Sequence, residues 1–379
     1  MLGAERRAHI VEQAQRDGSV RVADLVASLH VSDVTVRRDI DLLAQEGLLE
    51  KVHGGALLAR ESSTGTPARA AVVEPDTERL GRPQPAEARH HPVVGVLVPK
   101  SPYYFKRVVD GARDVLRAES RLVLAVSDYE PGKERDLVAG LLDAGAEALL
   151  LAPCALGEES GDDARTWIEQ LPVPVVLVER RLVGLSRAGI SSVRTAHENG
   201  AAAAVAHLAG LGHRRIALFT RGDTPTALGV RNGWRQALEQ LRLPTDVPCV
   251  SGTDLPGWPR WEPQQVEQFA RRLKDDGATA LLCHSDEDAL ALLQNGLSTS
   301  LDVPGELSVV AYDDEFSEFA NPPLTAVSPP KYEVGSLAMR TLLEITADPD
   351  ASVRHIEVEP RLIIRDSTGP RAAALRRPR

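Results

Sequence analysis

Short apolar runs alternate with amphipathic stretches along most of the chain, from Val93 onward. The first run, Val93–Val98, is followed by a stretch with helical spacing from Val108 to Leu116. Fully apolar strands separated by helices are typical of βαβ units, in which helices cover both faces of a parallel sheet. The strands outnumber those that one compact sheet of about 150 residues needs, so the pattern predicts two α/β lobes. The expected strands are Val93–Val98, Leu122–Val126, Ala148–Leu151, Val173–Val178, Ile216–Phe219, Ala280–Cys283 and Leu307–Ala311.

The chain of 379 residues is too long for one ordinary core, and its character changes along its length. Residues 1–58 have helical periodicity and end in a Gly-Gly turn, which predicts a small α+β domain. Residues 59–91 are rich in proline and charge and have almost no apolar periodicity, so we expect a flexible linker. Residues 92–370 form the two-lobed α/β domain, and residues 371–379 form a basic tail.

The N-terminal segment has the pattern of a winged helix-turn-helix. Ser32 is a good N-cap for a third helix, and Leu48–Val52 and Ala56–Leu58 are expected to form a small β-hairpin. Two short helices, a tight turn and a helix with a polar N-terminal face are typical of DNA-binding helix-turn-helix domains. The expected core positions are Ile10, Val11, Ala14, Val22, Leu25, Val26, Leu29, Val36, Ile40 and Leu43.

The start of the third helix carries the candidate DNA contacts, because residues there reach base edges in the major groove. Arginine can bond bidentately to guanine, and threonine offers a methyl group and a hydroxyl group. Ser32, the helix N-terminus and Lys51 suit phosphate contacts. The expected DNA-binding residues are Ser32, Thr35, Val36, Arg37, Arg38, Lys51 and His53.

The overall charge does not by itself favour nucleic acid. The net charge is −10 and the first sixty residues hold eight Lys/Arg and nine Asp/Glu, so affinity for DNA must come from the placement of charges. A winged helix used for protein contacts is the alternative. The two surface arginines, Arg37 and Arg38, have no role in the core and favour DNA, whereas Asp39 is expected to form a local salt bridge.

These N-terminal residues resemble the DNA-binding domain of the DeoR family, in order and spacing, over about residues 3–58. The resemblance implies binding to a double-stranded DNA operator. The stretches that carry it are Val22-Ala23-Asp24-Leu25, Val31-Ser32, Thr35-Val36-Arg37-Arg38-Asp39-Ile40, Glu46-Gly47-Leu48-Leu49 and Val52-His53-Gly54-Gly55-Ala56.

Aromatic and charged residues follow several of the expected strands in the large domain. In open α/β sheets, ligands bind beyond the carboxyl ends of the strands. The loop Tyr103-Tyr104-Phe105 can stack on a sugar or nucleobase, or pack at the start of a helix. Helix capping is the alternative role for Asp286 and Asp314. The other strand-end residues are Asp128, Glu179, Arg180, Ser285 and Asp313, and Arg231 begins a helix.

Residues 93–370 resemble the effector-binding domain of the LacI/GalR family, which is related to periplasmic sugar-binding proteins. Val93–Pro99, Pro174–Arg180 and Val303–Asp314 are among the stretches that carry the resemblance. It implies two similar lobes joined by three crossovers, with a ligand between them. It also implies every ligand contact below except Asp128, which is expected from its strand-end position. The expected ligand-binding residues are Tyr104, Phe105, Asp128, Arg180, Arg231, Asp286 and Asp313.

Several positions depart from the family pattern. Pro102 and Ser285 stand where asparagine is usual, Ala196-His197 replaces Asp-Asn, and Pro329 replaces a frequent glutamine. A common hexose or purine effector therefore does not follow from the resemblance. The family's hinge helix is also absent, so we hypothesise that coupling between ligand and DNA passes through dimer geometry and the linker.

Catalysis is poorly supported, so we predict that the chain is not an enzyme and needs no cofactor. It has no Gly-x-Ser-x-Gly elbow, no standard phosphate-cradling loop and no zinc spacing. The spacing of His284, Asp286 and Asp288 does not define a metal site. Cys154, Cys249 and Cys283 lie far apart, which indicates reduced thiols.

The sequence therefore predicts a ligand-responsive transcriptional regulator, a repressor controlled by a sugar or a related small molecule. We expect a cytoplasmic protein, because no apolar run approaches the ~20 residues of a membrane helix and no signal pattern is present. We also expect a homodimer, because paired DNA-binding domains that read two half-sites increase affinity and specificity. One alternative is a solute-binding protein of sugar transport, which has no use for a DNA-binding domain. The other is a sensor of a phosphorylated sugar, which would need a phosphate-binding loop.

Overall fold

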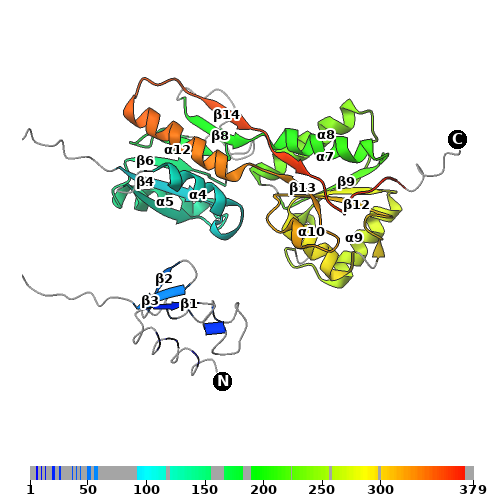
Figure 1. Cartoon of the computed structure of the whole chain (residues 1–379). Helices are drawn as coiled ribbons and strands as arrows, with labels where there is room; N and C mark the ends of the chain where they lie inside the picture. The colour runs from blue at the N-terminus through cyan, green and yellow to red at the C-terminus, as the bar shows by residue number, and fades with distance from the viewer. Residues whose placement is uncertain are drawn as a thin grey trace, which may run out of the picture. The chain divides into compact units, whose positions relative to one another are not determined.

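The computed structural model of the chain divides into two compact units, Met1–Gln84 and Pro85–Arg379, which are described separately (Figure 1). The described residues of the first unit are 6, 10, 13, 19–21, 25–26, 36, 40, 43, 49–52 and 55–58. Those of the second unit are 92–116, 120–154, 166–181, 189–222, 224–255, 258–297 and 300–371.

The first unit contains an antiparallel sheet in the order β1-β3-β2. Strands β2 (Leu49–Val52) and β3 (Gly55–Leu58) pair as a hairpin, which confirms the predicted wing. Strand β1 (Ser19–Arg21) pairs antiparallel with β3. The sequence did not predict β1, because three residues are too few to show an alternating pattern. Of the predicted core residues that the structure describes, Ile10, Leu25, Val36, Ile40 and Leu43 are buried, whereas Val26 is only half-buried.

The second unit contains two six-stranded sheets, each at the centre of one lobe. The sheet of the first lobe has the order β14-β8-β7-β6-β4-β5, and all its strand pairs are parallel. Its strands are β4 (Val93–Val98), β5 (Arg121–Val126), β6 (Ala148–Leu151), β7 (Val175–Val178), β8 (Ser191–Thr195) and β14 (His355–Val358).

Helices cover both faces of this sheet, as the alternation predicted. Helices α4 (Lys106–Val115) and α12 (Lys331–Ala347) pack on one face, and α5 (Pro131–Asp143) packs on the other. The close crossing of α4 and α12 requires a glycine, because a Cβ atom at Gly111 would lie 2.0 Å from the carbonyl oxygen of Tyr332.

The sheet of the second lobe has the order β10-β9-β11-β12-β13-β15, parallel except for the pair of β13 with β15. Helices α7 (His197–Gly210) and α8 (Pro225–Gln240) cover one face, and α9 (Pro263–Asp275) and α10 (Asp286–Leu292) cover the other. The strands are β9 (Ile216–Thr220), β10 (Cys249–Ser251), β11 (Ala280–Cys283), β12 (Ser308–Tyr312), β13 (Thr325–Ser328) and β15 (Arg361–Ile363).

The chain crosses between the lobes three times, from β8 to α7, from β13 to α12 and from β14 to β15. Two parallel-rich α/β lobes with these crossovers confirm the predicted fold class. All seven expected strands are present, with ends shifted by up to two residues. The sequence pattern missed β8, β10, β13, β14 and β15, because these strands are short or partly polar.

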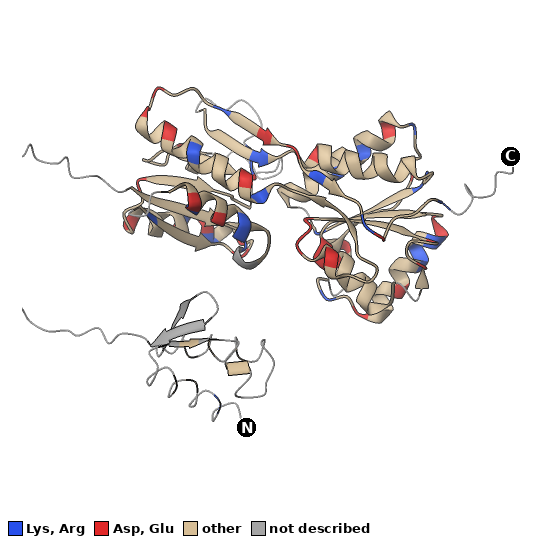
Figure 2. Ribbon diagram, viewed as in Figure 1, with Lys and Arg blue, Asp and Glu red and all other residues tan. Residues whose placement is uncertain are grey.

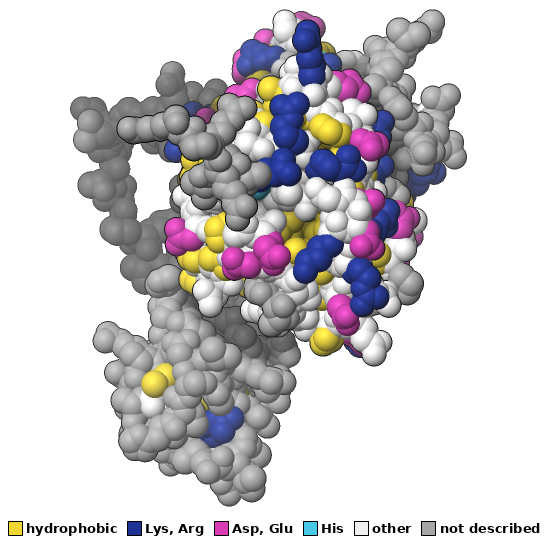
Figure 3. Space-filling model, turned by 90° about the vertical axis from the view of Figure 1, so that its right-hand side faces the viewer, with side chains coloured by type: hydrophobic (Ala, Val, Ile, Leu, Met, Phe, Trp, Pro, Cys, Tyr) yellow, Lys and Arg dark blue, Asp and Glu magenta, His cyan; other side chains and the backbone are white. Residues whose placement is uncertain are grey.

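Lys and Arg as well as Asp and Glu are distributed along the helices and strands of both lobes of the second unit (Figure 2). On the face drawn in Figure 3, Lys and Arg are interspersed with Asp and Glu, and hydrophobic side chains reach the surface only in small groups. No helix in the described part of the chain is long and apolar enough to cross a membrane.

Candidate ligand site between the lobes

A cavity of about 490 Å³ lies between the two lobes, within the size range of small-molecule sites. Most of its lining residues come soon after the carboxyl ends of strands, where the sequence predicted a ligand. The first lobe contributes Lys100, Tyr103, Tyr104, Phe105, Tyr129, Pro131 and Cys154. The second lobe contributes Arg221, Gly222, Thr224, Thr226, Thr253, Trp258, His284 and Asp313.

Backbone strain is concentrated at the same strand ends. Of the six non-glycine residues with positive φ angles in the described part of the chain, five follow β5, β7 or β12. They are Asp128, Tyr129, Glu179, Asp313 and Asp314, with φ between 52° and 88°. Such conformations cost free energy and persist where the surrounding structure imposes them, often at binding sites.

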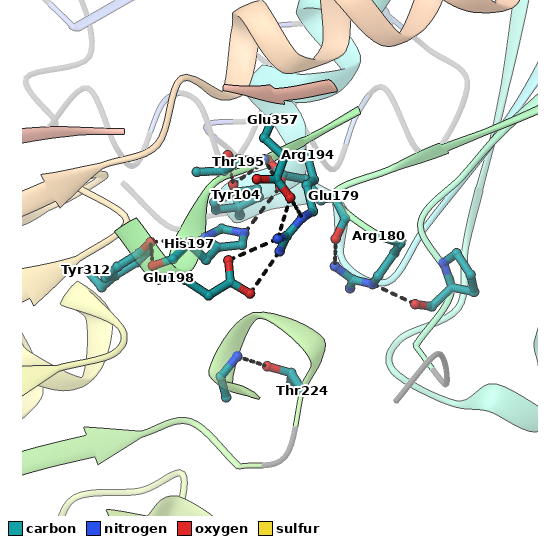
Figure 4. Close-up of polar contacts among 12 residues, drawn as sticks. Tyr104, Glu179, Arg180, Arg194, Thr195, His197, Glu198, Thr224, Tyr312 and Glu357 are labelled. Atoms are coloured by element: carbon teal, nitrogen blue, oxygen red, sulfur yellow. Dashed lines mark hydrogen bonds and ion pairs between the residues drawn. The ribbon is translucent and has the colours of Figure 1, made fainter. Parts of the chain in front are cut away.

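The buried carboxylate of Glu179 holds the two lobes together beside the cavity (Figure 4). It accepts hydrogen bonds from the hydroxyl of Tyr104 at 2.6 Å and from the backbone N–H and hydroxyl of Thr195 at 2.9 and 2.8 Å. The Nε2 atom of His197, at the start of α7, lies 3.2 Å from its other side, at ion-pair distance but without hydrogen-bond alignment. Burial alone would raise the pKa of Glu179, but these contacts lower it to about 2.

His197 extends this network into the second lobe, because its Nδ1 atom lies 3.1 Å from the hydroxyl of Tyr312. Tyr312 ends β12 and precedes Asp313, which lines the cavity. The contacts therefore run from β7 of the first lobe, through the crossover into α7, to the cavity wall of the second lobe.

Tyr103 reaches across the cavity from the first lobe to the second. Its hydroxyl donates a hydrogen bond to Oδ1 of Asp286 and lies 3.2 Å from Oδ2 of Asp313. The other oxygen of Asp286 accepts from the backbone N–H of Phe316 at 2.6 Å and from the hydroxyl of Ser317 at 3.2 Å. Both oxygens of the Asp286 carboxylate are thus bonded within the protein.

Asp313 is the least satisfied carboxylate at the cavity. Its Oδ1 atom is buried and has no hydrogen-bond partner in the described part of the chain. Burial, followed by the charge of Asp286, raises the pKa of Asp313 to about 7 against the opposing charge of Lys331. The Lys331 ammonium donates to the backbone carbonyl of Asp313 and pairs with Glu315 at 2.6 Å, so it does not bond the Asp313 carboxylate.

Arg221 is the cation of the second-lobe wall, and its charge is matched. It pairs with Glu287 and lies 3.9 Å from the carboxylate of Asp288. Asp288 in turn accepts from the indole N–H groups of Trp258 at 3.1 Å and Trp261 at 2.9 Å.

Trp258 can line the cavity because residue 252 is glycine. A Cβ atom at Gly252 would lie 2.5 Å from Cε2 of the Trp258 ring. The described residues contain no group of three or more His, Cys, Asp or Glu that could hold a metal ion.

His284 is buried at the end of β11 with its ring edge-to-face against Tyr312, at a centroid distance of 5.6 Å. Burial, followed by the nearby positive charges of His197 and Arg221, lowers the pKa of His284 to about 3. The ring is therefore neutral near pH 7. Its Nδ1 atom is buried and has no hydrogen-bond partner among the described residues.

The structure brings some of the predicted ligand residues together and leaves others apart. Tyr104, Phe105 and Asp313 line the cavity, whereas Asp286 lies behind Tyr103. Buried Arg180 donates to the carbonyl oxygens of Pro153 and Glu179, at 2.7 Å each, and its guanidinium lies over the ring of Phe105. Asp128 is exposed, and half-buried Arg231 has interactions within the protein; neither lines the cavity.

Of the predicted DNA contacts, the structure describes two positions. Val36 is fully buried, so it belongs to the core of the first unit and its assignment as a DNA contact was wrong. A β-branched side chain on the inner face of a helix cannot reach a base. Lys51 lies in strand β2 of the hairpin. Ser32, Thr35, Arg37, Arg38 and His53 lie outside the described residues.

Sequence reasoning missed three kinds of cavity residue. The predicted aromatic loop included Tyr103, but nothing in the sequence indicated that it would reach Asp286. His284 was considered only as a metal ligand. Thr224 and Thr226 lie at the N-terminus of α8 and line the cavity. In the sequence, only their position shortly after a strand could have indicated that they line it.

Comparison with known proteins agrees with this two-part organisation. Residues 6–62 match the family model of DeoR-like helix-turn-helix domains, and residues 205–368 match that of periplasmic-binding-protein-like domains. The chain is 26% identical to the arabinose metabolism transcriptional repressor of Geobacillus stearothermophilus over 354 residues, 91% of this chain and 90% of the relative. It is 26% identical to catabolite control protein A of Priestia megaterium, covering 77% of this chain and 87% of the relative.

Solved structures show the same fold for the large domain. A LacI family transcriptional regulator from Enterococcus faecium with bound ribose aligns with a TM-score of 0.58 and 24% identity, over 73% of this chain and 99% of that chain. A CelR–cellobiose complex aligns with a TM-score of 0.61 and 23% identity, over 73% of this chain and 84% of that chain.

The chain is therefore a transcriptional regulator with a DeoR-like helix-turn-helix domain and a periplasmic-binding-protein-like domain. Its named relatives are regulators and not enzymes, in agreement with the sequence prediction.

Proposed function

We propose that this chain is a repressor that binds a double-stranded DNA operator through its N-terminal domain. In this proposal a sugar-like effector binds in the cavity and changes the affinity of the protein for the operator. The observation that carries the proposal is a cavity between two lobes, at the strand ends, in the same chain as a DeoR-like domain. Relatives named as an arabinose repressor and neighbours with bound ribose or cellobiose support a sugar.

The DNA contacts that we propose are Ser32, Thr35, Arg37 and Arg38 on the third helix, with Lys51 and His53 on the wing. Arg38 is the candidate for a bidentate bond to guanine. Lys51 and Ser32 are candidates for phosphate contacts, which fix position but not sequence.

We further propose a cytoplasmic homodimer, because two paired DNA-binding domains on adjacent half-sites increase affinity and specificity. The domain boundaries that we propose are those of the sequence prediction, at residues 1–58, 59–91, 92–370 and 371–379. In this arrangement the effector changes dimer geometry, and the linker transmits the change. A solute-binding protein for transport is disfavoured by the DeoR-like match.

The first experiment selects bound sequences from a random DNA pool with the full-length protein and then measures operator affinity with and without each of several sugars. Arg38→Ala is expected to weaken specific binding by about 1–3 kcal/mol while leaving the thermal unfolding of the protein unchanged. Sedimentation velocity on the free protein measures the oligomeric state.

The outcomes separate the parts of the proposal. If Arg38→Ala binds the operator with normal affinity, base recognition lies with other residues. If no sugar both raises the melting temperature of the protein and changes its affinity for the operator, the proposal of a sugar effector is abandoned. A monomer on and off DNA rules out the homodimer.

A further inference from the structure

Tyr103 joins the two lobes through contacts that do not belong to the crossovers. It lies in the segment η1 (Ser101–Phe105) of the first lobe, and its hydroxyl contacts Asp286 at the start of α10 and Asp313 after β12 in the second. Its ring also lies 5.8 Å from the ring of Phe316, between centroids. When two lobes separate, the chain bends at the crossovers, so contacts made elsewhere are the ones that break.

The hydroxyl of Tyr103 has one proton but faces two carboxyl groups. The closer contact is with Oδ1 of Asp286, which accepts this proton, and the phenol oxygen lies 3.2 Å from Oδ2 of Asp313. A phenol donates one hydrogen bond, and its oxygen can also accept one. An ionised Asp313 would place two acceptors against each other. The second contact is a hydrogen bond when Asp313 carries a proton and donates it to the oxygen of Tyr103.

Asp286 is the acceptor at the far end of this chain of hydrogen bonds. Its side chain is fully buried, and its Oδ2 atom accepts from the backbone N–H of Phe316 at 2.6 Å and from the hydroxyl of Ser317 at 3.2 Å. With Tyr103, the two oxygens accept three hydrogen bonds. Because all three partners donate, Asp286 acts only as an acceptor.

Asp313 has no comparable set of donors. Its Oδ1 atom is buried without a hydrogen-bond partner among the described residues, and Lys331 donates to its backbone carbonyl oxygen. Burial and, after it, the charge of Asp286 raise the pKa of Asp313 to about 7, against the opposing charges of Lys331 and His197. The proton that the hydrogen bond to Tyr103 requires is therefore exchanged near neutral pH.

The other titratable groups around Asp313 are either paired with a carboxylate or uncharged. Lys331 pairs with Glu315 at 2.6 Å, and His197 faces Glu179 at 3.2 Å. Partial or full burial raises the pKa of the neighbouring phenols and lowers that of the neighbouring imidazole to about 3. These groups, uncharged near pH 7, are Tyr104, Tyr129, Tyr312 and His284.

We propose that Tyr103 and Asp313 form a proton-dependent latch between the lobes. The protonated carboxyl group of Asp313 donates to the hydroxyl of Tyr103, which donates to Asp286, and these hydrogen bonds hold the lobes together. When Asp313 loses its proton to water, two carboxylates face one phenol and the lobes separate. The inference goes beyond the proposed function, because it concerns the separation of the lobes and needs neither effector nor DNA.

Deprotonation favours separated lobes because only the latched form raises the pKa of Asp313. Separation exposes the carboxyl group to water and returns its pKa towards 3.8, from about 7 in the latched form. The stabilisation of the latched form is therefore complete below pH 3.8 and is lost as the pH rises through 7. From pH 5.5 to pH 8.5, the ratio of separated to latched molecules is expected to rise by up to about 30-fold.

The test measures the distance between the lobes in the full-length protein by pulsed electron–electron double resonance. One spin label is attached to Cys249, which is exposed in β10 of the second lobe, and the other to Lys133→Cys, at an exposed position of α5 in the first lobe. The thiol of Cys154 has a pKa raised to about 12 by burial, and Cys283 is fully buried, so both react slowly with the label. An excess of unlabelled protein removes distances between two copies.

The distances are compared at pH 5.5 and pH 8.5. One population is expected at pH 5.5, and a second, with separated lobes, is expected to increase relative to it by about tenfold or more at pH 8.5. The same distance distribution at both pH values overturns the inference.

Variants in this labelled background separate the latch from other titrating groups. Tyr103→Phe removes the hydroxyl that links the two carboxyl groups, so the separated population is expected at both pH values. Asp313→Asn places an amide N–H donor where the protonated carboxyl group donates, so the lobes are expected to stay latched at both pH values. Glu344→Gln, at an exposed ion pair with Arg354, is the control and should respond to pH like the wild type.

Two results with the variants would overturn the inference. One is a folded Tyr103→Phe protein with the distances of the wild type at both pH values. The other is an Asp313→Asn protein that responds to pH as the wild type does, because another group would then carry the titration. Circular dichroism checks that each variant is folded, and if Tyr103→Phe is not, the comparison of the wild type with Asp313→Asn decides. No effector or operator enters these measurements, so failure of the proposed function would leave the latch unaffected.

Discussion

The two walls of the cavity are built from the same architecture but differ in chemistry. The first-lobe wall is mainly aromatic, with Tyr103, Tyr104, Phe105 and Tyr129, whereas the second-lobe wall carries threonines, Arg221, His284 and Asp313. Both walls lie at the ends of parallel strands, so the fold gives each lobe the same position and leaves the side chains to differ. The second-lobe wall also includes Trp258, so it combines an aromatic ring with most of the polar and charged side chains of the lining.

Glu179 of the first lobe bonds Tyr104 and Thr195 and faces His197 at the start of α7 in the second lobe. Glu179→Gln removes the charge of a buried carboxylate that accepts three hydrogen bonds, and weakening these bonds is expected to lower the free energy of unfolding by about 3–5 kcal/mol. Urea unfolding followed by circular dichroism measures the change.

Glu344→Gln is again the control, because Glu344 forms an exposed ion pair with Arg354 at 2.5 Å in the first lobe. Its unfolding midpoint should not change measurably. Equal shifts for the two variants would mean that the Glu179 network contributes no more than a surface pair.

The pKa of Asp313 in the second lobe is shifted in the opposite direction to that of Glu179. Its pKa rises from 3.8 to about 7 on folding, so the folded state holds the proton more tightly than the unfolded chain does. The resulting stabilisation is complete below pH 3.8 and is lost as the pH rises through 7. Relative to Asp313→Asn, the wild type is expected to lose up to about 4 kcal/mol between pH 4 and pH 8.

Thermal unfolding of both proteins across this pH range measures the difference. A wild-type curve that runs parallel to the variant's curve from pH 4 to 8 would exclude a raised pKa at Asp313. Glu179 cannot produce the same slope, because its pKa of about 2 places its loss of stability below pH 4.5.

Gly252→Ala tests the packing of the second-lobe wall. The added methyl group would lie 2.5 Å from the Trp258 ring, so the ring must move, at a cost of about 1–3 kcal/mol. Tryptophan fluorescence and thermal unfolding report the movement and the cost.

Gly140→Ala in helix α5 is the matched substitution with the smallest expected effect. Nothing lies within 4 Å of a Cβ atom there, so the variant should be more stable than the wild type by about 0.5–1 kcal/mol. Destabilisation of both variants to the same extent would show that the space beside Trp258 is not the cause.

Much of the fold was predictable because apolar periodicity is a local property of the chain. The runs at Val93–Val98 and Ala280–Cys283 are buried strands, as expected. Strand β8 has the sequence Ser-Ser-Val-Arg-Thr and carries no such signal. Its burial depends on pairing with β7 and β14, which lie far apart in the sequence.

The ligand site was only partly predictable for a related reason. Parallel strand ends gather at one edge of a sheet, and Tyr104, Phe105 and Asp313, which the family resemblance implied as ligand contacts, line the cavity at that edge. Position does not say which partner a side chain reaches. Arg180 donates hydrogen bonds to two backbone carbonyl oxygens, and Val36 is buried in the core of the first unit.

The sequence by itself determined the two-part organisation, the parallel lobes and the edge of the sheets at which the cavity lies. These features follow from periodicity, strand ends and local motifs, each carried within a few residues. Only the tertiary structure decided that Tyr103 bonds Asp286, 183 positions away, and that Glu179 of the first lobe faces His197 of the second. Hydrogen bonding between distant side chains depends on how the two lobes close, and no local pattern encodes that distance.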